Sequence, residues 1–190
     1  VSTTGRAWRF LYAPQLPHTD EPNIEEQVKF VLKNYHFDTN TIIVTHSLGG
    51  VAALKLLLRL HVRVAMVVMV VPPLRTEFLD GKRRPPLERA TDWQFDFKNV
   101  RDKASSFVVI RDIHDRVVPP EHPIEIARNL HAKLVEVAAP ESHFDCPEAA
   151  TVLATESPPI TRPSAARPTS SDEKKTVELW SRRLSSLGIS

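Results

Sequence analysis

A serine lies on what the sequence predicts to be an abrupt turn between a strand and a helix. Residues 41–50 read TIIVTHSLGG, and an apolar run with helical character follows them. A serine on such a turn projects its hydroxyl clear of the sheet, which is the arrangement of a nucleophile elbow. Ser47 is therefore a candidate nucleophile. The backbone N–H of Leu48, at the positive end of the new helix, is the candidate hydrogen-bond donor to an oxyanion.

The elbow pattern is imperfect, and Ser47 also has a structural interpretation. Crowding in the turn favours glycine two residues before and two residues after the serine. Gly49 stands at the second position, whereas Thr45 occupies the first. Serine is also a preferred residue at the start of a helix, where its hydroxyl caps a backbone N–H. This segment alone leaves both interpretations of Ser47 open.

An aspartate and a histidine that could work with this serine follow later in the chain. Asp115 lies in the segment DIHDRVVP after one predicted strand, and His143 lies in APESHF after the next. Open α/β sheets place their sites just beyond the carboxyl ends of their strands. In the order serine, aspartate, histidine, the aspartate would orient the histidine and the histidine would deprotonate the serine. The three residues predict acyl transfer through an acyl-enzyme.

Other histidines near these motifs are expected to have no chemical role. His46 adjoins the candidate nucleophile and is expected to pack against the sheet rather than to act as a base. The remaining candidates lack the paired helical spacing of a zinc site, so no metal and no cofactor are predicted. They are expected to be solvated surface side chains: His114, His122 and His131.

The elements that must position these residues alternate between short β-branched runs and longer helical segments. Near-continuous apolar strands are typical of a parallel sheet covered by helices on both faces. Strands are predicted at Arg9–Ala13, Thr41–Thr45, Val64–Val71, Phe107–Arg111 and Leu134–Ala138. Helices are predicted at Ile24–Asn34, Leu48–Leu60, Ile124–His131 and Pro147–Ala154, the first of them capped by Asn23. The predicted fold class is α/β, a three-layer sandwich with a mostly parallel sheet.

Proline placement indicates how the rest of the chain is organised. Residues 1–155 are expected to form the α/β domain, and residues 156–175, rich in proline and serine, a flexible linker or insertion. Residues 176–190 carry one apolar stripe and predict a C-terminal amphipathic helix that packs on the domain, with a frayed tail as the alternative. Within the domain, the charged, proline-interrupted stretch Leu74–Asn99 contains three aromatic residues and predicts a lid or a wall of a site.

Composition excludes several classes of protein. The 25 Lys and Arg residues nearly balance the 23 Asp and Glu residues, so no nucleic-acid partner is predicted. The single cysteine, Cys146, excludes a disulfide scaffold and is expected to be a small buried residue rather than a nucleophile. The longest apolar run, Val64–Val71, is too short to span a bilayer, so no membrane span is predicted. No signal peptide is apparent either, and a cytoplasmic location is expected.

Four segments give the chain a resemblance to a known family. They are YAPQLP at residues 12–17, the elbow HSLG at 46–49, DRVVP at 115–119, and His143-Phe144. Together they resemble the small serine hydrolases of the α/β-hydrolase superfamily related to retinoblastoma-binding protein nine and the bacterial YdeN proteins. The resemblance implies a Ser47 nucleophile, an orienting Asp115 and a His143 base, and the spacing to Val118-Pro119 favours Asp115 over Asp112. It also implies hydrolysis of small acyl esters, thioesters or amides.

The chain departs from this family at its start. Relatives begin with an earlier strand that ends in a His-Gly loop and supplies a second oxyanion donor, and no His-Gly pair precedes the elbow here. That strand would lie between the strands at Arg9–Ala13 and Thr41–Thr45. We therefore expect an N-terminally truncated fold, with weak activity or none. The alternative is a catalytically weak or dead scaffold that binds a protein partner.

Overall fold

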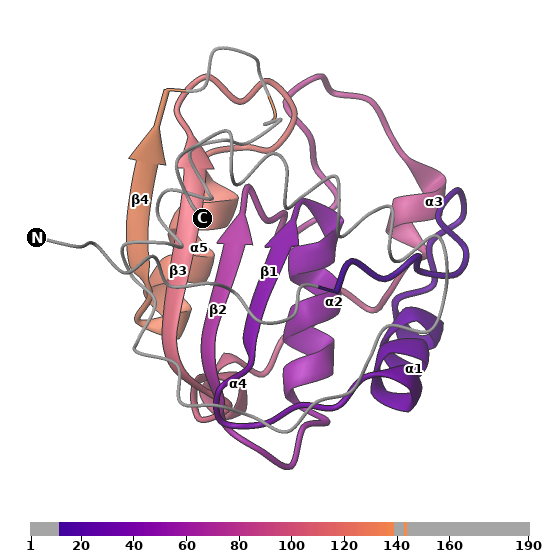
Figure 1. The fold of residues 1–190 in the computed structure, drawn as a ribbon. Helices are drawn as coiled ribbons and strands as arrows, with labels where there is room; N and C mark the ends of the chain where they lie inside the picture. Colours follow the sequence, from indigo (N-terminus) through magenta and orange to yellow (C-terminus); the bar gives the residue numbers. More distant parts are fainter. Residues whose placement is uncertain (1–11, 139–142, 144–190) are drawn as a thin grey trace, which may run out of the picture. The chain divides into compact units, whose positions relative to one another are not determined.

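A parallel sheet organises the described part of the chain, which in this computed structural model comprises residues 12–138 and 143 (Figure 1). Its strands are β1 (Ile42–His46), β2 (Val64–Val70), β3 (Ala104–Asp112) and β4 (Lys133–Val137), and they lie side by side in chain order. All neighbouring pairs are parallel. These strands and all the helices described below belong to one compact unit, Leu16–Cys146.

Helices cover one face of this sheet. They are α1 (Ile24–Asn34), α2 (Leu48–Leu57), α3 (Pro85–Glu88), α4 (Phe97–Arg101) and α5 (Glu121–Leu130). Helix α2 packs on β1 and β2, α5 packs on β3 and β4, α4 contacts both of these helices, and α1 packs on α2 (Figure 1). Strands that follow one another in order, joined by right-handed crossovers, place their connecting helices on one face. The parallel α/β architecture predicted from the sequence is therefore confirmed.

The two strands nearest the elbow differ in burial. Every residue of β2 is buried, which explains why its sequence is continuously apolar instead of alternating. Val67 and Met69 face the helical core, whereas Val68, also fully buried, points to the opposite face. In β1, by contrast, Val44 is 47% exposed. Within the described residues β1 pairs with β2 alone, so β1 forms one edge of the described sheet.

The predicted elements agree with the structure most closely where the sequence signal comes from neighbouring residues. Helix α1 has the predicted bounds, and the Oδ1 atom of Asn23 accepts the backbone N–H of Glu26 at 3.2 Å, as expected of its cap. Strand β3 begins three residues earlier than predicted, at Ala104. Helix α2 ends at Leu57 rather than at Leu60, because the backbone N–H of Leu60 bonds to the carbonyl of Leu57 in a tighter turn.

Helix α5 begins at Glu121, three residues before the predicted start. Pro123 lies in the first turn, where a proline loses no hydrogen bond because the first N–H groups of a helix have no intrahelical acceptor. The earlier start places His122 in line with Ile126 and Leu130 on the buried face. The expectation that His122 is a solvated surface histidine is therefore wrong: only 3% of the residue is exposed.

Several predicted elements lie outside the described residues. They are the helix at residues 147–154, the linker at 156–175, the C-terminal helix at 176–190, and residues 9–11 of the first predicted strand. Tyr12 and Ala13, the described end of that strand, are not in a strand. Within the part of the chain that the structure describes, no helix combines the length and the apolarity needed to cross a bilayer.

A close contact fixes the start of α2 against the chain that leaves β2. A Cβ atom added to Gly50 would lie 2.8 Å from the Cβ atom of Pro72, a distance that real Cβ atoms do not tolerate. One added to Gly49 would meet Thr45 at 3.5 Å, an ordinary van der Waals distance. The glycine that packing requires is therefore Gly50, three residues after the serine, and not Gly49 as the elbow pattern suggested.

The two glycines provide a matched pair of variants. Both are helical, so Gly49→Ala and Gly50→Ala gain the same helix propensity, up to about 1 kcal/mol. Gly50→Ala must also displace the rigid ring of Pro72, and overpacking of this kind costs about 1–3 kcal/mol. Urea unfolding should show Gly49→Ala at least as stable as the parent chain and Gly50→Ala clearly less stable. Equal midpoints for the two variants would contradict the contact.

Burial of His122 should make the stability of the fold depend on pH. Burial, reinforced by nearby Arg75, lowers the pKa of His122 below its ordinary value of 6.5. The unfolded chain consequently takes up a proton on His122 at a higher pH than the folded chain does. The stability that His122 contributes is present above about pH 6.5 and declines as the pH falls below that value.

We expect His122→Leu to remove part of the loss of stability between pH 7.5 and pH 5.5, as measured by urea midpoints. His61→Leu, at an exposed histidine on the loop between α2 and β2, is the control and should leave the pH dependence intact. An unchanged pH dependence in His122→Leu would count against the burial argument.

Candidate active site

Ser47 occupies a sharp left-handed turn between β1 and α2. Its backbone has φ 51° and ψ −125°, a conformation that residues other than glycine rarely adopt. Its N–H donates to the carbonyl of Val70 at 2.9 Å, which extends the β1–β2 ladder by one residue, and its carbonyl accepts the N–H of Gly50 at 2.9 Å. Ser47 is the N-cap residue of α2, but its hydroxyl caps no N–H of that helix, so the side-chain cap of the structural interpretation is not formed.

Leu48 is the first residue of α2. Its N–H is therefore one of the groups at a helix start that have no acceptor within the helix. The positive end of the helix dipole lies at the same place. The backbone at Leu48 thus offers the features expected of a donor to a developing oxyanion.

Asp115 and His143 form a pair. The Nδ1 atom of His143 lies 3.2 Å from Oδ2 and 3.4 Å from Oδ1 of Asp115. The Asp115 side chain is only 5% exposed, and that of His143 is 24% exposed. Oδ1 of Asp115 also accepts the backbone N–H groups of Val117, at 2.7 Å, and Val118, at 3.0 Å. The carboxylate is thereby fixed by its own loop, with His143 beside it.

These contacts keep Asp115 ionised. Burial opposes the charge, but the hydrogen bonds from His143, Val117 and Val118 outweigh it, so the pKa of Asp115 lies below its ordinary value of 3.8. At neutral pH the carboxylate is therefore an acceptor, and the Nδ1 atom beside it carries the proton. That tautomer leaves Nε2 of a neutral His143 available to accept a proton.

The other candidate aspartate, Asp112, is the last residue of β3 and contacts its own loop instead of His143. Asp112, 3% exposed, accepts the backbone N–H of His114 on its Oδ1 at 2.9 Å, and its carbonyl accepts the N–H of Asp115 at 3.3 Å. Asp112 thereby shapes the loop on which Asp115 stands. The contact with His143 belongs to Asp115, as the motif spacing favoured.

His46 differs from its expected position. It was expected to pack against the sheet, yet the residue is exposed and contacts His143. Its Nε2 atom lies 3.2 Å from the carbonyl oxygen of His143, and the two rings meet edge to face with centroids 5.1 Å apart. Nothing in the sequence indicated this contact, since the two residues are 97 positions apart. Within the described residues, no hydrogen bond joins the hydroxyl of Ser47 to the imidazole of His143.

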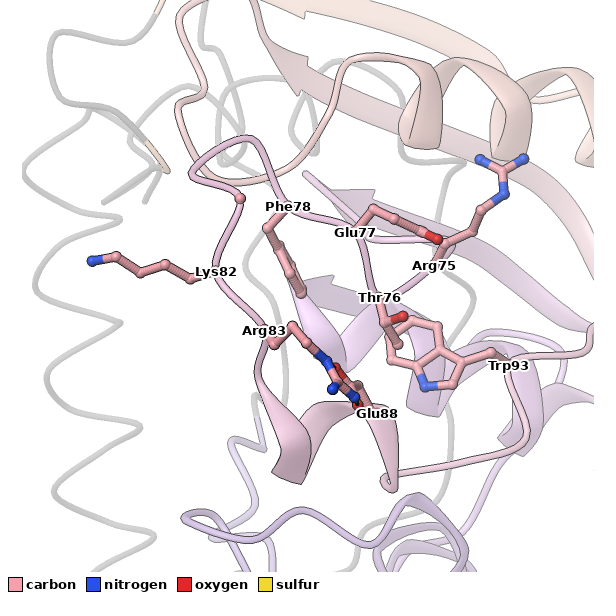
Figure 2. A pocket seen from close by; sticks show the side chains of 9 residues that line it. Arg75, Thr76, Glu77, Phe78, Lys82, Arg83, Glu88 and Trp93 are labelled. Carbon is pink, nitrogen blue, oxygen red and sulfur yellow. Dashed lines mark hydrogen bonds and ion pairs between the residues drawn. The ribbon is translucent and has the colours of Figure 1, made fainter.

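The stretch Leu74–Asn99, predicted to be a lid or wall, contains a pocket of about 690 Å³ (Figure 2). In Figure 2, Lys82 extends away from the other labelled side chains, while Arg83 lies against Glu88, with which it forms an ion pair. Trp93 lines this pocket and, like Phe95 and Phe97, packs on the hydrophobic core. Ser47, Asp115 and His143 do not line it. A hydrogen bond from the N–H of Leu79 to the carbonyl of Val117 joins this stretch to the Asp115 loop.

Within the part of the chain that the structure describes, the other histidine candidates form no metal site. Among the described residues, no three histidine, cysteine, aspartate or glutamate side chains gather so as to hold a metal ion. His114 is exposed, and exposed His131 ends α5 and lies 2.8 Å from a guanidinium nitrogen of Arg101. Cys146 lies outside the described residues.

The fold of this chain is similar to that of solved structures of other proteins. The ydeN gene product of B. subtilis is 24% identical, with a TM-score of 0.57 and coverage of 68% of each chain. The enol-lactonase of Burkholderia xenovorans LB400 is 17% identical, with a TM-score of 0.49, and the match covers 75% of this chain and 73% of that one. Est1E of Butyrivibrio proteoclasticus is 14% identical, with a TM-score of 0.49 and coverage of 87% and 72%. The likeness to the ydeN product shows the fold. No curated protein matches the chain in sequence.

Information about the activity comes from a match between the chain and the sequence model of a protein family. The model described as Serine hydrolase matches residues 11–155, which is more than half of the chain. The matched region contains the elbow, the Asp115 loop and His143. The resemblance drawn from the sequence motifs is thereby confirmed: the chain belongs to the serine hydrolase family.

Proposed function

We propose that this hydrolase cleaves small acyl esters through a triad of Ser47, His143 and Asp115. The observation that carries the proposal is the pairing of His143 Nδ1 with the buried Asp115 carboxylate at 3.2 Å. Such a pair holds an imidazole in the tautomer whose second nitrogen accepts a proton. The left-handed turn at Ser47, whose hydroxyl caps no helix N–H, supports the assignment of the nucleophile.

The reaction has two steps. In the first, Nε2 of His143 takes the proton of the Ser47 hydroxyl as Oγ bonds to the acyl carbon, and the resulting tetrahedral intermediate expels the alcohol, which leaves with that proton. In the second, His143 removes a proton from water as the water oxygen bonds to the acyl carbon, and it returns that proton to Oγ of Ser47 as the Ser47 ester bond breaks. The products are a carboxylic acid and the free enzyme.

The start of α2 would stabilise the charge that develops on the substrate. The N–H of Leu48 is the proposed donor to the oxyanion in both steps, aided by the helix dipole. Asp115 would stay ionised and stabilise the His143 imidazolium that forms between the two proton transfers. The chain's own residues thus account for the nucleophile, the base, the orienting acid and one oxyanion donor.

Small acyl groups are the proposed substrate class. The segment between β2 and β3, which leaves the carboxyl edge of the sheet, forms only two short helices, α3 of four residues and α4 of five. Such a modest cover favours small esters, with thioesters and amides as related substrates.

Labelling with a fluorophosphonate tests the nucleophile and base together. We expect stoichiometric labelling of the parent chain and none of Ser47→Ala, with a severe loss in His143→Ala. Hydrolysis of p-nitrophenyl acetate should fall towards the uncatalysed rate in Ser47→Ala, because the nucleophile of the triad is removed.

The fold of each chain should be checked by circular dichroism. A folded parent chain that takes up no probe would contradict the proposal and favour a scaffold that binds a protein partner. Labelling that persists in Ser47→Ala would assign the nucleophile elsewhere.

Asp115→Asn tests the orienting acid. An amide is neutral and favours the wrong tautomer of His143, so kcat should fall by about 10⁴-fold, with little change in KM. Asp112→Asn is the paired variant at the other candidate, and its kcat should fall far less because Asp112 bonds to its own loop. A larger loss in Asp112→Asn than in Asp115→Asn would exchange the two roles. Steady-state kinetics on p-nitrophenyl acetate provides the measurement.

A further inference from the structure

The exposed histidine before the nucleophile contacts the backbone of the proposed base. The Nε2 atom of His46 lies 3.2 Å from the carbonyl oxygen of His143. A carbonyl oxygen only accepts hydrogen bonds, so the Nε2 atom of His46 must be the donor. The edge-to-face packing of the two rings, at a centroid distance of 5.1 Å, adds a second contact between the same residues.

The backbone of His143 needs such support. Its φ is 68°, in the left-handed region, where a residue other than glycine is strained by about 1–3 kcal/mol. Strained backbone persists only when its surroundings hold it in place. Asp115 holds the ring of His143 through Nδ1, and this bond acts on the side chain rather than on the backbone.

We propose that His46 is a positioning residue for this hydrolase: its Nε2–H holds the carbonyl of His143 and so sets the distance between base and nucleophile. His46 and Ser47 share a peptide bond at the end of β1, so a bond from His46 to His143 ties the base to the strand that carries the nucleophile. The base is then fixed at two points, with its ring on Asp115 and its backbone on His46. The inference rests on the proposed function of Ser47 and His143.

Two substitutions separate the hydrogen bond from the ring contact. His46→Phe keeps an aromatic ring but has no N–H, whereas His46→Gln has no ring but places an amide nitrogen where Nε2 stood. His46→Asn carries the same amide one carbon closer to the backbone and does not reach. His61→Phe makes the same change of residue type on the loop between α2 and β2 and is the control.

We expect His46→Phe and His46→Asn to lower kcat by about 10-fold to 100-fold, the effect of misplacing a catalytic group by about 1 Å. KM should change less than twofold, since the substrate contacts remain. His46→Gln should recover kcat to within about threefold of the parent chain, and His61→Phe should equal it. If His46→Gln is as slow as His46→Phe, or if His46→Phe keeps the parent kcat, the proposal is wrong.

A second measurement needs no activity and so separates this proposal from the proposed function. With ¹³C in histidine carbonyls and ¹⁵N in phenylalanine amides, only the pairs His36-Phe37 and His143-Phe144 give a linked signal, and the first is an internal reference. The His143 carbonyl signal should move in His46→Phe and return in His46→Gln, in the parent chain and in Ser47→Ala alike. An unmoved signal refutes the hydrogen bond, whereas failure of the parent chain to take up fluorophosphonate refutes the triad alone.

Discussion

The parallel pairing of β1 with β2 is the constraint on which the candidate site depends. It continues for one residue beyond β1, through the bond from the Ser47 N–H to the carbonyl of Val70, and this bond holds Ser47 at a φ of 51°. Helix α2 can then begin at once, with Gly50 pressed against Pro72. A shift of one residue between the two strands would turn every side chain of β1 to the other face and redirect the serine. The position of the nucleophile is therefore a property of the sheet.

Sequence patterns predicted the fold wherever the signal is local. The continuous apolar run of β2 and the Asn23 cap of α1 each depend on neighbouring residues, and both appear in the structure as expected. The predicted starts of two elements were wrong where the neighbouring residues carry no clear signal. Strand β3 begins at Ala104 because it pairs with Val64, although Ser105 and Ser106 look unlike a buried strand. The early start of α5, and with it the burial of His122, was not predicted.

Some features of the candidate site could likewise be predicted from local sequence patterns, and others could not. Ser47, Asp115 and His143 were identified from residue type, chain order and placement after strands, because a parallel sheet brings the carboxyl ends of its strands to one edge. The contact of His143 with Asp115, rather than with Asp112, depends on how one loop folds around its own N–H groups. The contact of His46 with His143 joins residues 97 positions apart, and no pattern in either segment encodes it.

Strained backbone also occurs beside the site, at Val71, which immediately follows β2. Val71 is β-branched and 1% exposed, yet its φ is 43°, and its N–H is bonded to the carbonyl of Ile110 at 2.8 Å. With Ser47 and His143, it is one of three residues of positive φ at or beside the site, each held at a cost of about 1–3 kcal/mol. Stored strain of this kind relaxes as soon as its surroundings loosen. On heating, the geometry at the carboxyl edge should consequently decay before the sheet itself melts, so that loss of catalysis and loss of fold become two separate thermal events.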